Sequence, residues 1–163
     1  IPHAWRLVIR GPTTMLRYIK PDAPVVIHPP KDGWYDTGDV VSIDEDGSIK
    51  IRGRLKRFAK IGGEAVSLAV VESCASAVWP DYSHAAVAVP DRTKGEQIVL
   101  VTDCPNAERM DLVGWAHNHG VSELAIPRRI VQVDAVPVLG TGKTDYARVQ
   151  KMVADADMRL GGA

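Results

Sequence analysis

Lys143 is the residue whose type and setting point most directly to chemistry. It stands in GTGKTD (140–145), where two glycines keep the loop backbone uncluttered and easy to bend. An ammonium on such a loop could stabilise the charge that builds on a phosphate under attack by a carboxylate, a contact worth about 3–4 kcal/mol. The alternative is an ordinary solvated lysine. The loop is not of the GxxxxGK[ST] type, because Pro137 stands where the first glycine is required.

A second candidate group lies in GWYDTGD (33–39) and at the end of the hairpin that follows. The two oxygens of the Asp39 carboxylate could accept hydrogen bonds from both vicinal hydroxyls of a ribose, as acidic residues do in dinucleotide sites. Arg54 offers a planar fork of donors that suits phosphate or sugar oxygens. Each residue has a simpler alternative, since Asp39 could only cap a turn and Arg54 could be a solvated surface residue.

The segment from 50 to 60 is basic throughout. Six cationic residues and no acidic one stand in it: Lys50, Arg52, Arg54, Lys56, Arg57 and Lys60. Such a segment could steer an acidic or phosphorylated partner, and its alternative is a solvated face.

Short strands and loops must position these residues. β-rich runs bounded by turn residues predict strands at 5–10, 40–43, 48–52, 84–90, 97–102 and 129–133. The strands at 40–43 and 48–52 are expected to form a hairpin. The proline-rich stretch 20–33 and the segment 137–145 are expected to be loops.

Three helices are predicted from the spacing of apolar residues. The first covers 68–78, with Ser67 as its N-cap. The second is capped by Asn106 and ends at Gly120, and the third is capped by Thr144. The inward face of the third helix is expected to comprise Tyr146, Val149, Met152 and Val153.

The order of elements after residue 55 is helix, strand, strand, helix, strand, helix. This order predicts an α+β fold, a small mixed β-sheet with flanking helices. Residues 1–54 contain strands and loops only, so we expect a β-rich piece at 1–54 and an α+β domain at 55–163, with the boundary near Arg54–Lys56. The chain begins without Met or a signal-peptide pattern, and we expect it to be cut from a longer protein.

Composition argues against several classes of protein. Twenty basic and twenty acidic residues cancel, so no nucleic-acid partner is expected. No apolar run approaches the roughly 20 residues of a membrane helix. Cys74 and Cys104 lack a CxxC spacing and are expected to be reduced. His117 and His119 are two apart in a predicted helix and face different ways, so no metal site is predicted.

Four segments, taken in order, resemble signature motifs of the AMP-forming superfamily of acyl-CoA synthetases, luciferases and peptide-synthetase adenylation domains. They are RGPTTMLRYI, DGWYDTGD, GRLKRFAKIGGEAVS and PVLGTGKTD. The resemblance implies the mobile carboxyl-terminal domain of these enzymes, preceded by a β-strand and hairpin from the large amino-terminal domain. The phosphate-binding loop, adenine pocket and acyl tunnel would belong to that large domain, so this chain alone is expected to be inactive.

The resemblance also implies roles for individual residues. Asp39 would hold the ribose hydroxyls of ATP and AMP, and Arg54 would support the same nucleotide, together with Tyr35 and Thr37. Lys143 would orient the carboxylate and the α-phosphate during formation of the acyl-adenylate. Mg²⁺ would accompany ATP, bound mainly by the large domain.

Other residues match the part of the family that serves the second half-reaction. Lys56 occupies the hinge position. Lys60, Gly62 and Gly63 match the loop that lines the pantetheine tunnel. In the family the small domain swings about the hinge, so that Lys143 and this loop take turns at one active site.

A closer resemblance links KRFAKIGGEAVSL, HGVSELAIPRRI and VPVLGTGKTDY to the bifunctional acyl-[acyl-carrier-protein] synthetase/2-acylglycerophosphoethanolamine acyltransferase. It implies a fatty acid substrate, an acyl carrier protein or CoA as acceptor, and phospholipid re-acylation by a cytoplasmic protein on the inner face of the bacterial inner membrane. Arg17 and Ala59 depart from the family pattern. The alternatives are a non-catalytic carrier-protein docking module of the same fold and an amino-acid adenylation domain.

Overall fold

The computed structural model describes residues 4–14 and 30–160. Arg17 and most of the loop expected at 20–33 lie outside these residues. The chain divides into two compact units, Ile1–Lys56 and Arg57–Ala163, which we call the first and second units.

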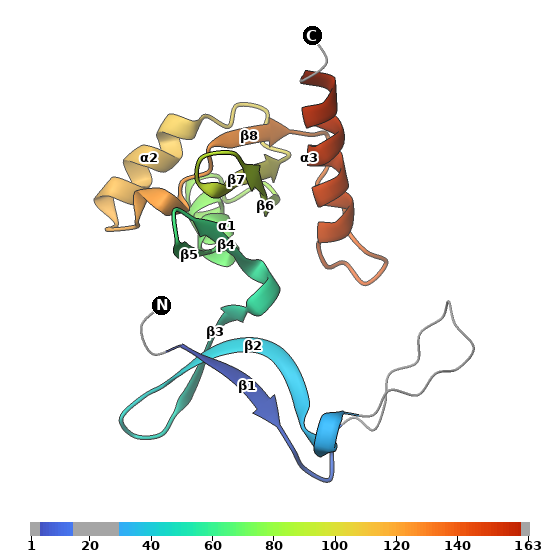
Figure 1. Cartoon of the computed structure of the whole chain (residues 1–163). Helices are drawn as coiled ribbons and strands as arrows, with labels where there is room; N and C mark the ends of the chain where they lie inside the picture. Colours follow the sequence, from blue (N-terminus) through green and yellow to red (C-terminus); the bar gives the residue numbers. More distant parts are fainter. Residues whose placement is uncertain (1–3, 15–29, 161–163) are drawn as a thin grey trace, which may run out of the picture. The chain divides into compact units, whose positions relative to one another are not determined.

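The first unit is a three-stranded antiparallel sheet in the order β1-β2-β3 (Figure 1). Its strands are β1 (Trp5–Ile9), β2 (Tyr35–Ile43) and β3 (Ile49–Arg54). Short 3-10 turns, η1 (Lys31–Gly33) and η2 (Leu55–Arg57), precede β2 and follow β3. The hairpin expected from the sequence is present, but its first strand begins five residues before the expected 40–43.

The second unit contains a five-stranded mixed sheet. Its strands are β4 (Phe58–Ile61), β5 (Glu64–Ser67), β6 (His84–Asp91), β7 (Gly95–Thr102) and β8 (Arg129–Gln132). β6 pairs antiparallel with the whole of β7, so β4 and β8 share the other edge of that strand. β8 is parallel to β7, which confirms the predicted mixed sheet.

The β4–β5 hairpin was not expected from the sequence, which predicted a helix as the first element after residue 55. Its turn is Gly62-Gly63, and both glycines have positive φ (59° and 89°). Two glycines between short strands are a strong hairpin signal, because they reach the left-handed region without strain.

Three helices complete the unit: α1 (Leu68–Val78), α2 (Arg109–Asn118) and α3 (Tyr146–Leu160). The predicted span of α1 and the position of its N-cap Ser67 are correct, although the serine side chain makes no capping hydrogen bond. Gly120 follows the C-cap of α2 with φ 65°, as its predicted place after the helix requires.

The caps predicted for the other two helices are wrong. α2 begins at Arg109, and its N-cap is Glu108 rather than Asn106. At the start of α3 the Oδ1 of Asp145, and not Thr144, accepts a hydrogen bond from the backbone N–H of Arg148 at 3.1 Å. A carboxylate satisfies the free N–H groups of a first turn as well as a hydroxyl does, so the shift by one residue costs the helix little.

Helices cover both faces of the second sheet (Figure 1). On one face, α1 and α2 pack on alternate residues of β6 and β7, including Ala86, Ile98 and Leu100. On the other face, Val149 and Val153 of α3 pack on the intervening residues, among them Ala85, Val87, Val89, Val99 and Val101. The period of two along a strand separates these cores, and the predicted α+β class is confirmed.

The two cysteines lie inside this unit. Cys74 and Cys104 are both buried and free. Burial raises the pKa of the Cys74 thiol above its ordinary value. Both thiols therefore act as small apolar core groups rather than as reactive sites.

Candidate functional site

Asp39 and Arg54 lie side by side in the first unit. They are direct partners in the register of β2 and β3. The Arg54 Nε lies 2.8 Å from the Asp39 Oδ1, and the arginine side chain is 66% exposed whereas the aspartate is 13% exposed. The guanidinium also donates to the Thr37 carbonyl at 3.0 Å. The sheet therefore places a carboxylate and a guanidinium side by side.

The motif YDTGD lies within β2, so Asp39 stands inside a strand and not at a turn. The Thr37 hydroxyl donates to the Leu7 carbonyl of β1 and accepts from the Asp39 N–H, both at 3.0 Å. Thr37 thus fixes the backbone beside Asp39. Tyr35 is half-buried and pairs with Ile9 in β1.

Asp36, within the same motif, is held by the first strand. Its carboxylate accepts hydrogen bonds from Arg6 Nε at 2.9 Å and from the Gly38 N–H at 3.0 Å. The Arg6 hydrogen bond, more than the Gly38 N–H, lowers the pKa of Asp36 to about 2. The sequence did not single out this pair, which helps to hold β1 against the Asp39 motif.

Lys143 lies in the second unit on a turn with a defined shape. An isolated bridge joins Val138 to Thr144. Across it, the Leu139 N–H donates to the Lys143 carbonyl at 2.7 Å and the Gly142 N–H donates to the Leu139 carbonyl at 2.8 Å. Gly142 has φ 80°, a conformation that favours glycine. The glycines therefore shape a hydrogen-bonded turn rather than leave the loop without structure.

The ammonium of Lys143 is exposed. Within residues 4–14 and 30–160, no hydrogen bond or ion pair engages it. Val138 and Leu139 on the same turn are 61% and 47% exposed. The tip is therefore on an open face and not locked into the interior of its unit, which the predicted role demands.

The residues predicted for the hinge and the tunnel are also at the surface. Lys56 is exposed in η2 and is the last residue of the first unit. Lys60 is exposed in β4, and its backbone N–H donates to the Glu96 carboxylate. A Cβ added at Gly62 or Gly63 would meet no heavy atom within 4 Å, so this turn faces open space.

Contacts within the basic segment 50–60 do not favour a free positive surface. Lys50 lies 2.6 Å from Asp44, Arg52 donates to the Ser42 hydroxyl at 2.8 Å, and Arg54 is paired with Asp39. Arg57 is only 17% exposed and pairs with Glu72 at 2.6 Å. The segment also crosses the boundary between the units, so its charges do not form one continuous patch on either.

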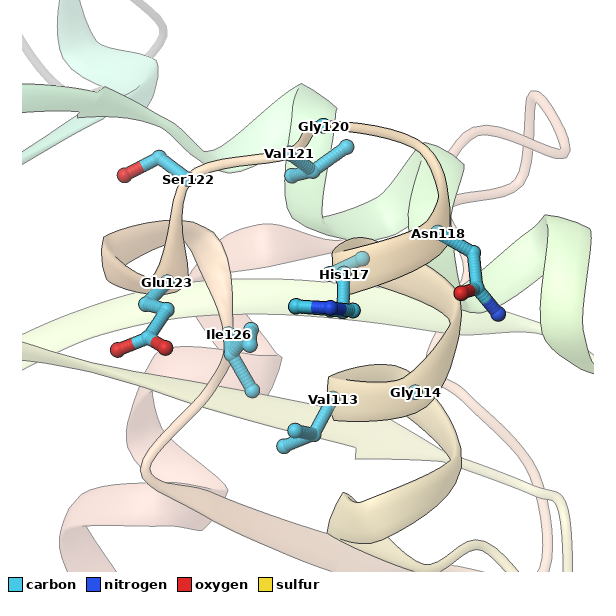
Figure 2. A pocket seen from close by; sticks show the side chains of 10 residues that line it. Val113, Gly114, His117, Asn118, Gly120, Val121, Ser122, Glu123 and Ile126 are labelled. Carbon is cyan, nitrogen blue, oxygen red and sulfur yellow. The ribbon is translucent and has the colours of Figure 1, made fainter.

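Two hollows open on the second unit, and none of the predicted site residues lines them. One of about 620 Å³ lies between α2 and the segment after it, with Val113, His117, Glu123 and Ile126 among its lining side chains (Figure 2). Another of about 310 Å³ lies beside Lys94, whose carbonyl accepts from the Gly62 N–H. The predicted site residues therefore lie outside these two hollows.

Within the described part of the chain, no three His, Cys, Asp or Glu side chains are grouped so that they could hold a metal ion. In the same residues, none of the helices combines the length and the apolar character needed to cross a membrane.

Comparisons with known proteins place this geometry in context, although no family model matches the chain. It is 30% identical over 153 residues to the 2,3-dihydroxybenzoate-AMP ligase of Bacillus subtilis, a match that covers 91% of this chain and 28% of that protein. It is 35% identical over 120 residues to the L-proline--[L-prolyl-carrier protein] ligase of Streptomyces coelicolor, covering 72% of this chain and 22% of that protein.

The structure also resembles a solved one. The amide bond synthetase McbA of Marinactinospora thermotolerans superposes with a TM-score of 0.70 and 26% identity, over 93% of this chain and 31% of that one. The chain thus spans between a fifth and a third of the proteins it matches. These relatives and neighbours are AMP-forming ligases and adenylation enzymes, which supports the adenylate-forming superfamily for this chain, and its fold matches the carboxyl-terminal domains of those enzymes.

Proposed function

We propose that the chain forms the carboxyl-terminal part of an ATP-dependent, AMP-forming ligase. In the first step a carboxylate oxygen of the acid attacks the α-phosphorus of ATP, and pyrophosphate leaves. In the second step the thiol of a phosphopantetheine, on CoA or on a carrier protein, attacks the acyl carbon and AMP leaves. The observation that carries this proposal is the exposed Lys143 ammonium on a shaped turn, within a fold shared with adenylate-forming enzymes.

Asp39 and Arg54 are proposed to hold the nucleotide. The Asp39 carboxylate would accept from the ribose hydroxyls, while Arg54, already bound to it, would orient it. Thr37 and Tyr35 lie on the same strand as Asp39 and hold that strand against β1. Mg²⁺ would accompany ATP and neutralise its phosphates, bound mainly by the large amino-terminal domain.

Lys143 and the turn containing Gly62 and Gly63 are proposed to serve the two steps in turn. They are carried by different elements. The Lys143 turn leads into α3, which covers one face of the sheet. The glycine turn follows β4, whose buried side chains face α1 and α2 on the other side of the sheet. Lys56 would be the hinge. Its position as the last residue before the second unit supports this role.

The first unit is proposed to be the β-rich end of the large amino-terminal domain. Among the described residues it leaves many large apolar side chains exposed, including Trp5 at 58%, Ile43 at 54% and Ile51 at 66%. Apolar surface on this scale in a three-stranded sheet needs a partner to cover it. The partner proposed here is the rest of that domain.

The finer proposal is that the acid is a fatty acid, passed to an acyl carrier protein for phospholipid re-acylation at the cytoplasmic face of the bacterial inner membrane. The segments KRFAKIGGEAVSL and VPVLGTGKTDY support it by their resemblance to that subgroup. A panel of fatty, aromatic and amino acids in acid-dependent ATP–pyrophosphate exchange tests it. Exchange with an aromatic or amino acid in place of fatty acids would contradict this finer assignment and leave the general one standing.

Substitution of Lys143 by Ala in the complete ligase tests the general proposal. Exchange should fall about 100- to 1000-fold, as expected for loss of a charge aimed at the transition state. Transfer to the thiol from supplied acyl-AMP should stay within about threefold, because that step does not use this loop. Lys151→Ala, at an exposed lysine on α3, is the matched control. Equal loss of both steps would contradict the role, and unchanged exchange would favour a non-catalytic docking module.

A further inference from the structure

Three residues far apart in the sequence meet in the second unit. Arg57 Nη2 lies 2.6 Å from the Oε1 of Glu72 on α1. The Tyr146 hydroxyl donates to the other oxygen, Oε2, at 3.2 Å. The Arg57 Cζ lies 3.7 Å from the centre of the Tyr146 ring, in a cation–π contact. Each residue thus contacts both of the others.

The edge strand β6 completes this cluster. Arg57 Nη1 donates to the Ala86 carbonyl and the Ala86 N–H donates to Glu72 Oε1, both at 2.8 Å. Arg57 and Glu72 are each only 17% exposed. A charge pair this poorly solvated keeps its geometry only when its donors and acceptors are satisfied, and here both carboxylate oxygens are engaged.

The position of the cluster along the chain matters more than its strength. Arg57 is the first residue of the second unit and follows Lys56 directly. Tyr146 is the first residue of α3, three residues after Lys143. At the base of the Lys143 turn, the Asp145 N–H donates to the Pro137 carbonyl at 2.9 Å. The cluster therefore ties the start of the unit to the end of the turn that carries Lys143.

We propose that Arg57, Glu72 and Tyr146 are positioning residues that clamp the Lys143 turn to the hinge end of the second unit. This inference rests on the proposed function for its catalytic consequence. A rotation about Lys56 moves Lys143 by its full extent only if the start of the second unit and the Lys143 turn move as one rigid body. The clamp provides that rigid link. Loosening it therefore impairs acyl-AMP formation, which uses Lys143, and does not change thiol transfer, which is served by the Gly62-Gly63 turn.

Hydrogen exchange on the chain itself tests the clamp without reference to catalysis. In Tyr146→Leu, the backbone amides of Leu139, Gly142 and Asp145 should exchange at least about tenfold faster, because the turn loses its anchor. The matched control is Gln150→Met, which removes a 2.8 Å hydrogen bond from α3 to the Ala88 carbonyl but lies beyond the turn. Loop exchange in this control should stay within about twofold of the original chain.

Tyr146→Phe and Glu72→Gln are milder variants that keep the shape of the cluster and serve where Tyr146→Leu does not fold. Each should raise exchange of the same amides about threefold. Unchanged loop exchange in all clamp variants, or an equal rise in Gln150→Met, would overturn the clamp.

Kinetics of the complete ligase then separate the clamp from the proposed function. Tyr146→Leu should lower kcat for acyl-AMP formation about tenfold with little change in the KM for ATP, and thiol transfer from supplied acyl-AMP should stay within about twofold. If Lys143→Ala abolishes acyl-AMP formation while Tyr146→Leu leaves kcat intact, the clamp is wrong and the proposed function stands. If Lys143→Ala has no effect, the proposed function is wrong, and the exchange experiment still decides the clamp.

Discussion

The two units of the chain bury their apolar residues to very different degrees. Among the described residues, Val40 and Val41 are the only buried apolar residues of the first unit, and many of its large apolar side chains are exposed. The second unit has two separate cores, one on each face of its sheet. A three-stranded sheet with one open face is marginal, whereas a sheet covered by helices on both faces is self-sufficient.

This difference separates the two kinds of candidate residue. Asp39 and Arg54 stand on the sheet that depends on further surface, and Lys143 stands on the unit that can hold its own shape. A group that must move between two poses is best carried by a rigid body, since a flexible carrier would lose the position of its charge. The self-sufficiency of the second unit is thus a physical requirement of the proposed mechanism.

Separating the units should give the largest effect. Residues 57–163 alone should unfold cooperatively with a melting temperature within about 5 °C of that of the whole chain, whereas residues 1–56 alone should show no cooperative transition. Far-UV circular dichroism during heating measures both. A cooperative transition of the 1–56 fragment would show that the first unit is stable by itself, contrary to this expectation.

Matched large-to-small substitutions should give the next largest difference. Leu112 is 1% exposed in the α1/α2 core, and Leu112→Ala should lower the free energy of unfolding by about 2–5 kcal/mol. Ile51 is 66% exposed in β3, and Ile51→Ala should change it by less than about 0.5 kcal/mol in this chain. Urea denaturation measures both values.

In the complete ligase, the cost of Ile51→Ala depends on whether the first unit is covered. If the rest of the large domain covers the Ile51 side chain in the complete ligase, Ile51→Ala should lower the free energy of unfolding by about 1–3 kcal/mol, because the methylene groups it removes are then buried. An equally small cost in both contexts would contradict the proposed large-domain partner.

The pH dependence of stability should show the smallest effect. The side-chain hydrogen bond from Thr93, followed by the Lys94 and Thr93 N–H groups, lowers the pKa of Asp91 from 3.8 to about 2. Because the folded pKa is lower, this group stabilises the fold above about pH 3.8 and loses that contribution as pH falls toward about 2. The difference in melting temperature between the original chain and Asp91→Asn should therefore narrow from pH 5 to pH 2.5.

Asp36 provides the control for that experiment, because its pKa is also lowered to about 2 but it lies in the first unit. Asp36→Asn should leave the melting of the second unit unchanged at each pH. An equal shift of this melting temperature with both substitutions would indicate that the two units unfold together, contrary to the expectation that the second unit is self-sufficient.

Sequence reasoning recovered the elements with clear periodicity. The span of α1 and the strands β6 and β7 follow from apolar spacing over eight residues or more, which outweighs local alternatives. The β4–β5 hairpin was missed although Gly62-Gly63 is a turn signal, because the four-residue strands on either side carry a weak pattern. The caps Asn106 and Thr144 were wrong because several polar residues stand near each helix start, and only the backbone path selects among them.

The residues that could do chemistry, and their order, follow from the amino-acid sequence, because a lysine after two loop glycines or an aspartate after Thr-Gly is a local pattern. It also determined the α+β class, since the periods of helix and strand are local as well. Arg57 is half-buried against two distant residues and not free on a basic surface, and this follows only from the tertiary structure. Its partners Glu72 and Tyr146 are 15 and 89 positions further along the chain, a contact that no local pattern encodes.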